Sequence, residues 1–285
     1  ALIVRPQQAP ELSVSTFSDA TILELWHSEH KIDQGTFFIH PLHRFNTGDV
    51  ARIAYDAVAK SRCRVYASEL VVSELVRTET RIPVPFCQRY IPSSNSGGDA
   101  CIVMQYVEGD VLDDVWATLS IWMKFRVIIT LRYYIRQLRM LPALLRLSNP
   151  GPIGGSPDYC ESRLLTEDPP NLFESYADMV TWYGMRHRFM QKYRKMPQNI
   201  AHFDDSRPLA IVHQDLHPRN LIMGRDGQLW VIDWGRAGVY PDWFEYGNLM
   251  MLAEESRGSG QMPFIRAILY SLRHLLRDIS DIDLT

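Results

Sequence analysis

The most chemically informative part of the sequence is a short polar motif followed by two apolar runs. Residues 213–220 are His-Gln-Asp-Leu-His-Pro-Arg-Asn, and an Asp-Trp-Gly triplet begins thirteen residues after Asn220, at Asp233. Residues 221–232 form an apolar run, an Arg-Asp-Gly turn and a second apolar run, which is typical of a β-hairpin. Because a hairpin folds back on itself, we expect Asn220 at its start and Asp233 at its end to lie side by side.

Three side chains of this motif suit metal-assisted phosphoryl transfer. Asp215 could orient an attacking hydroxyl and accept its proton. Asn220 and Asp233 offer the oxygen ligands that magnesium prefers, and magnesium would neutralise the phosphates of a nucleotide. The alternative is structural: a capping Asp before Pro218, a turn Asn and an Asp that ends a strand. The joint spacing favours the catalytic interpretation.

The motif resembles the catalytic loop of the protein-kinase-like superfamily, His-x-Asp-x-x-x-x-Asn, and its metal motif, with Asp-Trp-Gly in place of Asp-Phe-Gly. Three flanking stretches narrow the resemblance to the aminoglycoside-phosphotransferase-like small-molecule kinases, in their fungal branch: residues 81–85, 107–116 and 232–246. The similarity covers most of the chain from about residue 45 to 250.

This resemblance implies an α+β, two-lobed protein-kinase-like fold. The N-lobe, residues 1–107, would hold a small antiparallel sheet plus a helix and bind the nucleotide. The larger C-lobe, residues 108–285, would be mainly helical and carry the catalytic hairpin, the metal site and the acceptor pocket.

Local patterns agree with this organisation. Helices are expected at residues 18–31, with Ser18 as N-cap, and at 66–80, with Leu70, Val71 and Leu75 on one side and Val72 as a fourth candidate. A third, amphipathic helix is expected within Val127–Leu147, where four arginines exclude a membrane span. Strands are expected at residues 36–40, 42–45, 50–55, 57–60 and 101–107, with a turn at 46–49.

Lys60 ends one of these strands, and from there its ammonium group could reach the α- and β-phosphates of a nucleotide. Glu69, nine residues further on in the following helix, could pair with it, and Glu74 is the rival partner. Two ordinary surface charges are the structural alternative. Between His40 and Lys60 the only glycine is Gly48, so the sequence has no multi-glycine phosphate loop.

Two histidines of the motif have different expected roles. His217 lies where protein kinases often carry a lysine facing the transferred phosphate, so a protonated His217 could act as a catalytic donor, with a neutral histidine packed in the loop as an equal alternative. His213 is expected to brace the loop by hydrogen-bonding backbone. The family resemblance also makes residues 104–107 the connector between lobes, where backbone groups of Gln105 and Val107 would contact adenine.

Composition limits the classes of function. The 285 residues can bury a sizeable core, and a net charge of −3 argues against a general nucleic-acid binder. The N-terminal residues do not resemble a signal peptide, and the four cysteines contain no Cys-x-x-Cys pair, so reduced thiols and a cytoplasmic location are expected. Nothing in the sequence indicates an oligomeric state.

The resemblance implies ATP-dependent, magnesium-assisted phosphorylation of a hydroxyl group on a small molecule, without nucleic-acid or membrane partners. Two rivals stay open. One is a pseudokinase or repurposed kinase-fold protein that binds a ligand in the cleft without phosphotransfer. The glycine-poor loop favours this alternative, whereas the presence of Asp215, Asn220 and Asp233 argues against it. The other is a non-catalytic interaction scaffold.

Overall fold

The structure is a computed structural model that describes residues 13–27, 50–61, 67–92, 100–154, 162, 164–165, 173–193, 202–257 and 260–273. The strands predicted at 36–40 and 42–45, the turn at 46–49 and the glycine within it lie outside the described residues. Of the cysteines, Cys87 and Cys101 are described and both are free thiols.

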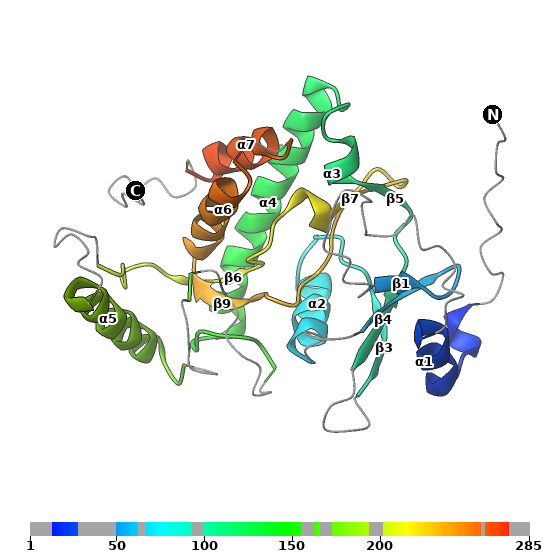
Figure 1. Cartoon of the computed structure of the whole chain (residues 1–285), viewed down its shortest axis with the longest axis horizontal. Coiled ribbons are helices and arrows are strands. Elements are labelled where there is room, and N and C mark those ends of the chain that lie inside the picture. The colour runs from blue at the N-terminus through cyan, green and yellow to red at the C-terminus, as the bar shows by residue number, and fades with distance from the viewer. Residues whose placement is uncertain are drawn as a thin grey trace.

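The first part of the chain builds a small lobe around one antiparallel sheet of strand order β1-β2-β4-β3, drawn in blue to green in Figure 1. Its strands are β1 (Val50–Arg52), β2 (Ala57–Ser61), β3 (Cys87–Ile91) and β4 (Cys101–Gln105). A 3-10 turn, η1 (Val14–Thr16), precedes helix α1 (Asp19–His27), and helix α2 (Ala67–Glu79) follows β2. The predicted strands at 50–55 and 101–107 are shorter than expected, because the chain bends after Arg52 and leaves the sheet after Gln105.

Helix α1 covers the small sheet. Its first turn is capped as predicted, because the Ser18 hydroxyl accepts a hydrogen bond from the Thr21 N–H at 3.1 Å. Ile22 and Trp26 are buried against the small side chains of the sheet, Ala57 among them, in a core cluster of their own. Alanines on the strands leave room for the bulky indole.

Helix α2 confirms the predicted helix at 66–80 to within a residue at each end, but one assigned side chain is wrong. Val72 and Val76 are fully buried and join the core of the large lobe, whereas Val71 is 36 % exposed. The helix is rotated so that the polar Glu69 also points inward, where only 2 % of its side chain is exposed. The spacing of apolar residues cannot predict this inward position of Glu69, because Glu69 takes part in an ion pair that is described below.

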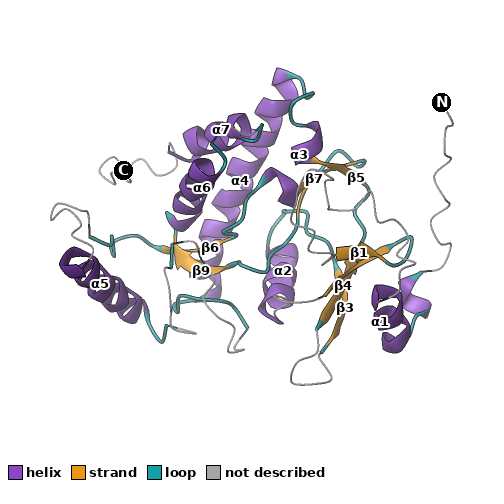
Figure 2. Ribbon diagram, in the orientation of Figure 1, coloured by secondary structure: helices purple, strands orange, loops and turns teal. Residues whose placement is uncertain are grey.

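The rest of the chain forms the larger, mainly helical lobe (Figure 2). Its helices are α3 (Leu112–Val115), α4 (Ile121–Leu145), α5 (Tyr176–Tyr193), η2 (Pro218–Asn220), α6 (Phe244–Glu255) and α7 (Met262–Arg273). Its strands are β5 (Gly109–Val111), β6 (Leu209–Val212), β7 (Leu221–Gly224), β8 (Leu229–Val231) and β9 (Gly238–Pro241). The expectation of helices apart from one hairpin was incomplete, because β5 extends the hairpin to three strands and β6 pairs with β9. The α+β, two-lobed kinase-like fold is confirmed.

The predicted hairpin is confirmed as β7–β8. Leu221 pairs with Val231 in an antiparallel register. At the turn, the Gln228 N–H donates to the Asp226 carboxylate at 2.9 Å, and Gly227 has a φ of 76°, in the left-handed region that glycine adopts without strain. The hairpin therefore returns the chain to its starting point.

Helix α4 is the spine of the large lobe and packs against β6 and α7. It begins six residues before the predicted stretch, with Ser120 as N-cap. No described helix has both the length and the apolar character needed to cross a bilayer. On α7, Phe264 is fully buried and meets the Trp116 ring edge-on, with 4.9 Å between ring centroids.

We expect Phe264→Ala to lower the free energy of unfolding by about 3–5 kcal/mol, because it removes a fully buried ring and leaves a cavity. Tyr270→Ala on the same helix is the matched control, since that ring is 71 % exposed, and it should change stability by less than about 0.5 kcal/mol. Urea denaturation of both variants measures the difference. Equal losses would contradict the placement of α7 on the core.

Candidate active site

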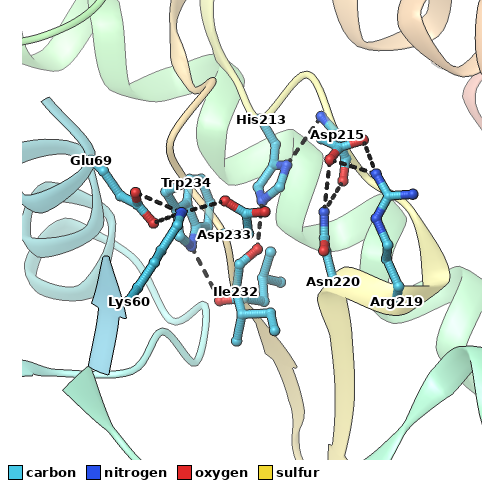
Figure 3. A network of polar contacts seen from close by, with 10 residues as sticks. Lys60, Glu69, His213, Asp215, Arg219, Asn220, Ile232, Asp233 and Trp234 are labelled. Atoms are coloured by element: carbon cyan, nitrogen blue, oxygen red, sulfur yellow. Dashed lines mark hydrogen bonds and ion pairs between the residues drawn. The ribbon is translucent and has the colours of Figure 1, made fainter. Parts of the chain in front are cut away.

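Lys60 lies at the centre of an ion network that joins the two lobes (Figure 3). Its Nζ donates to both carboxylate oxygens of Glu69 at 2.8 Å each, and to Asp233 Oδ1 at 2.8 Å. Glu74, the rival partner, pairs with Arg77 on the outer face of α2 instead. The predicted Lys60–Glu69 pair is therefore present, and Asp233 is its third member.

The two carboxylates favour the charged form of Lys60. Burial alone would lower the pKa of the Lys60 ammonium, but Asp233 and then Glu69 outweigh that effect and raise the pKa above its usual value. Gly235 of the Asp-Trp-Gly triplet lies against the pair, since a Cβ added there would be 3.1 Å from Glu69 Oε2. The glycine thus lets the chain after Asp233 pass close to both side chains.

Asp215 and Asn220 form a second group of contacts on the catalytic loop. The Asn220 Nδ2 donates to the Asp215 carbonyl at 2.9 Å and to Asp215 Oδ2 at 3.0 Å. The hairpin brings Asn220 next to the strand that ends at Asp233, because the Ile232 N–H donates to the Asn220 carbonyl at 3.0 Å. Figure 3 shows these two residues on facing sides of the hairpin entrance, as the sequence predicts.

His213 lies between the two groups in Figure 3 and braces the loop as expected. Its Nδ1 accepts from the Asp215 N–H at 3.2 Å, so Nε2 carries the proton and donates to the Ile232 carbonyl at 3.0 Å. Burial lowers the pKa of this imidazole, which keeps it neutral. The histidine therefore ties the backbone of the expected base to the residue before the expected metal ligand.

Glu245, near the start of α6, is a positioning residue that the sequence analysis missed. Its Oε2 accepts from the His213 N–H at 2.7 Å and from the Gln214 N–H at 3.4 Å. Gln214 has a φ of 66°, a strained conformation for a non-glycine residue, and the carboxylate helps to hold it. The signal available in the sequence was an acidic residue among aromatics in residues 242–246.

His217 does not have the environment of a catalytic acid. Only 2 % of it is exposed, and its Nδ1 accepts from the Arg219 N–H at 3.2 Å. Burial, followed by the nearby Arg219 guanidinium, lowers the pKa of His217 to about 4. It is therefore neutral at physiological pH, and the geometry favours the alternative of a histidine packed in the loop.

The connector between the lobes is only partly available to a ligand. The Gln105 N–H donates to the Phe86 carbonyl at 2.8 Å, and the Tyr106 N–H donates to the Asp56 carbonyl at 2.8 Å. The expected contact of Gln105 with adenine therefore cannot use its N–H group. Among the described residues none hydrogen-bonds the backbone of Val107, which leaves Val107 as the candidate.

The side-chain oxygen atoms of Asn220 and Asp233 are suitable ligands for magnesium. The Asn220 Nδ2 faces Asp215, so its Oδ1 lies on the other side of the carboxamide. Asp233 keeps 44 % of its side chain exposed although Lys60 contacts one of its oxygens. No group of three or more His, Cys, Asp or Glu side chains among the described residues is placed to hold a metal. Magnesium needs only one or two protein oxygens when phosphates and water complete its shell.

The fold is of the kinase type, and the family match agrees with a kinase-type phosphotransferase. The model of the phosphotransferase enzyme family matches residues 72–274, more than half of the chain, and the protein belongs to that family. No curated protein sequence matches the chain.

Solved structures of aminoglycoside phosphotransferases are similar in fold. A thermostable mutant of APH(4)-Ia in its apo form is 14 % identical with a TM-score of 0.50, covering 81 % of this chain and 75 % of that one. The gentamicin complex of APH(2")-IIa is 15 % identical with a TM-score of 0.46, covering 81 % and 75 %. The GDP complex of wild-type aminoglycoside 2'-phosphotransferase-IIIa is 19 % identical with a TM-score of 0.45, covering 82 % and 74 %.

Glu245 should make stability depend on pH. Burial raises its pKa from 4.5 to about 7, although the two N–H groups that it accepts from act to lower it. A raised folded-state pKa means that the contribution to stability is complete below pH 4.5 and is lost as pH rises through about 7.

As pH rises from 4.5 to about 7, we therefore expect the free energy of unfolding of wild type to fall by about 3 kcal/mol relative to that of Glu245→Gln. Denaturant unfolding at several pH values measures this difference. Glu254→Gln, an exposed position on the same helix, is the control and should show no such trend. A difference between wild type and Glu245→Gln that stays constant with pH would contradict the assignment.

Proposed function

We propose that this protein transfers the γ-phosphoryl group of ATP to a hydroxyl group of a small molecule, with magnesium. The observation that supports this most is the position of Asp215, Asn220 and Asp233 around the two ends of the β7–β8 hairpin, with Asp233 in contact with Lys60 of the Lys60–Glu69 pair. Each group has the chemistry that phosphoryl transfer requires, and none of them is used up by a purely structural role.

Asp215 is the general base in this proposal. Its carboxylate is 7 % exposed, and burial, which would raise its pKa, is outweighed by Arg219, so the group stays ionised. In the reaction the acceptor oxygen forms a bond to the γ-phosphorus, the bond from that phosphorus to the ADP oxygen breaks, and the hydroxyl proton passes to Asp215. Asn220 fixes the carboxylate by donating to Oδ2 at 3.0 Å.

The nucleotide would be held from both lobes, with the boundary between them proposed at residues 107 and 108. Lys60 can donate to the α- and β-phosphates while Glu69 keeps it in position. Asn220 Oδ1 and the Asp233 carboxylate would hold magnesium, which supplies positive charge against the phosphates when it is bound. The backbone of Val107 is the candidate contact for the base. GDP complexes of related folds are consistent with a nucleotide substrate.

His217 is proposed as a positioning residue and not as a proton donor. Its ring supports the Arg219 backbone and is hydrogen-bonded by Gln261, which also contacts Asp113 on α3. The loop is thereby fixed on the side away from His213. Gentamicin in the complex of a similar fold supports a hydroxyl-bearing small molecule as the class of acceptor. The glycine-poor loop favours a non-catalytic alternative, whereas the Lys60 contacts with Glu69 and Asp233 support phosphoryl transfer.

We expect Asp215→Asn to lower phosphoryl transfer by about two to four orders of magnitude, because the amide cannot accept the proton. Mg-ATP binding should stay close to that of wild type, since the side chain keeps its size and Lys60, Asn220 and Asp233 are unchanged. Phosphorus NMR with a panel of hydroxylated small molecules measures transfer, and Asp110→Asn, exposed on β5, is the control. Wild-type turnover in Asp215→Asn would exclude this base. A wild-type protein that neither binds Mg-ATP nor phosphorylates any compound would contradict the proposed function.

A further inference from the structure

Arg219 contacts the expected base directly. It lies in η2, four residues after Asp215, and its Nη2 donates to Asp215 Oδ2 at 2.9 Å and to Oδ1 at 3.1 Å (Figure 3). The two side chains differ in exposure, because 38 % of the arginine is exposed and only 7 % of the aspartate. The guanidinium therefore covers the carboxylate from the solvent side.

Arg219 is the cation whose hydrogen bonds to the base are resolved, and Arg236 also acts on Asp215 through its charge. Lys60 is held by Glu69 and Asp233. His217 is buried and neutral, so the phosphate-facing cation expected at that position is missing. Arg219 has a permanent charge and a planar group of donors that matches the oxygens of a phosphoryl group.

The geometry of transfer brings Arg219 close to the reacting group. An acceptor hydroxyl that gives its proton to Asp215 must lie within about 3 Å of that carboxylate. The phosphorus that it attacks must be within about 3.5 Å of the same hydroxyl. A guanidinium already 2.9 Å from the carboxylate can reach that phosphoryl group by rotation of its own exposed side chain.

We propose that Arg219 is a further catalytic residue with two successive partners. In the free protein it neutralises and holds Asp215. When nucleotide and acceptor are bound, it moves its hydrogen bonds to the oxygens of the transferred phosphoryl group, which frees an Asp215 oxygen for the hydroxyl. This inference rests on the proposed function, and it assigns Arg219 to the γ-phosphate, whereas Lys60 serves the other two phosphates.

The test compares the affinities of Mg-ATP and Mg-ADP, because only ATP carries the γ-phosphate. By calorimetry, Arg219→Ala should bind Mg-ATP about tenfold or more weakly than wild type and bind Mg-ADP equally well, as expected for the loss of a charge-assisted hydrogen bond. Its kcat should fall by about a hundredfold or more. Arg219→Lys should recover part of both losses, and Arg219→Gln, which can still donate to Asp215, should recover neither.

Arg225→Ala is the matched control, since that arginine lies on the same hairpin, is 76 % exposed and pairs with Glu108. It should change neither affinity. If Arg219→Ala keeps the wild-type ratio of ATP to ADP affinity, or if its kcat rises because the arginine only blocks the base, the inference is overturned while the proposed function stands. If wild type binds neither nucleotide, the proposed function fails, and the inference fails with it.

Discussion

The contact of one ammonium group with two carboxylates is the constraint on which the rest of the site depends. Lys60 on β2 donates to Glu69 on α2 and to Asp233 after β8, so three elements from both lobes converge on one atom. Glu69 is 2 % exposed, and a buried carboxylate without its partner would cost about 3–5 kcal/mol. The ammonium group therefore holds Glu69 of α2 and Asp233, the proposed metal ligand, next to each other.

A second layer of contacts fixes the base relative to that network. His213 connects the Asp215 N–H to the strand that ends at Asp233, and Glu245 on α6 accepts the N–H groups of the strained segment. In the proposed function, the polar side chains that would meet the reactants come from the loop, the hairpin and β2, and Glu245 of α6 holds the loop. The geometry of this candidate site is thus set by buried hydrogen bonds, which makes each of them costly to lose.

Sequence reasoning located the parts of the site that are close along the chain. The hairpin between Asn220 and Asp233 follows from local turn chemistry, and it is present. Glu245 and the pairing of β6 with β9 depend on contacts between distant segments, which leave no periodic signal. Val71 was misplaced because the buried face of α2 carries Val72 and Val76 together with the polar Glu69, which an apolar pattern does not include. Arg219 was overlooked because His217 was considered as the cation of the loop, with a neutral packed histidine as the equal alternative, and the burial of His217 becomes visible only in the fold.

A crystal structure with magnesium and a non-hydrolysable ATP analogue tests the central claim most directly. The account predicts a metal ion with Asn220 Oδ1 and an Asp233 carboxylate oxygen among its ligands, at about 2.1 Å, bridging to phosphate oxygens. Lys60 should contact the α- and β-phosphates, and Asp215 should face the γ-phosphate. A nucleotide bound elsewhere, or a metal that contacts neither Asn220 nor Asp233, would contradict the claim that this hairpin is a phosphoryl-transfer site.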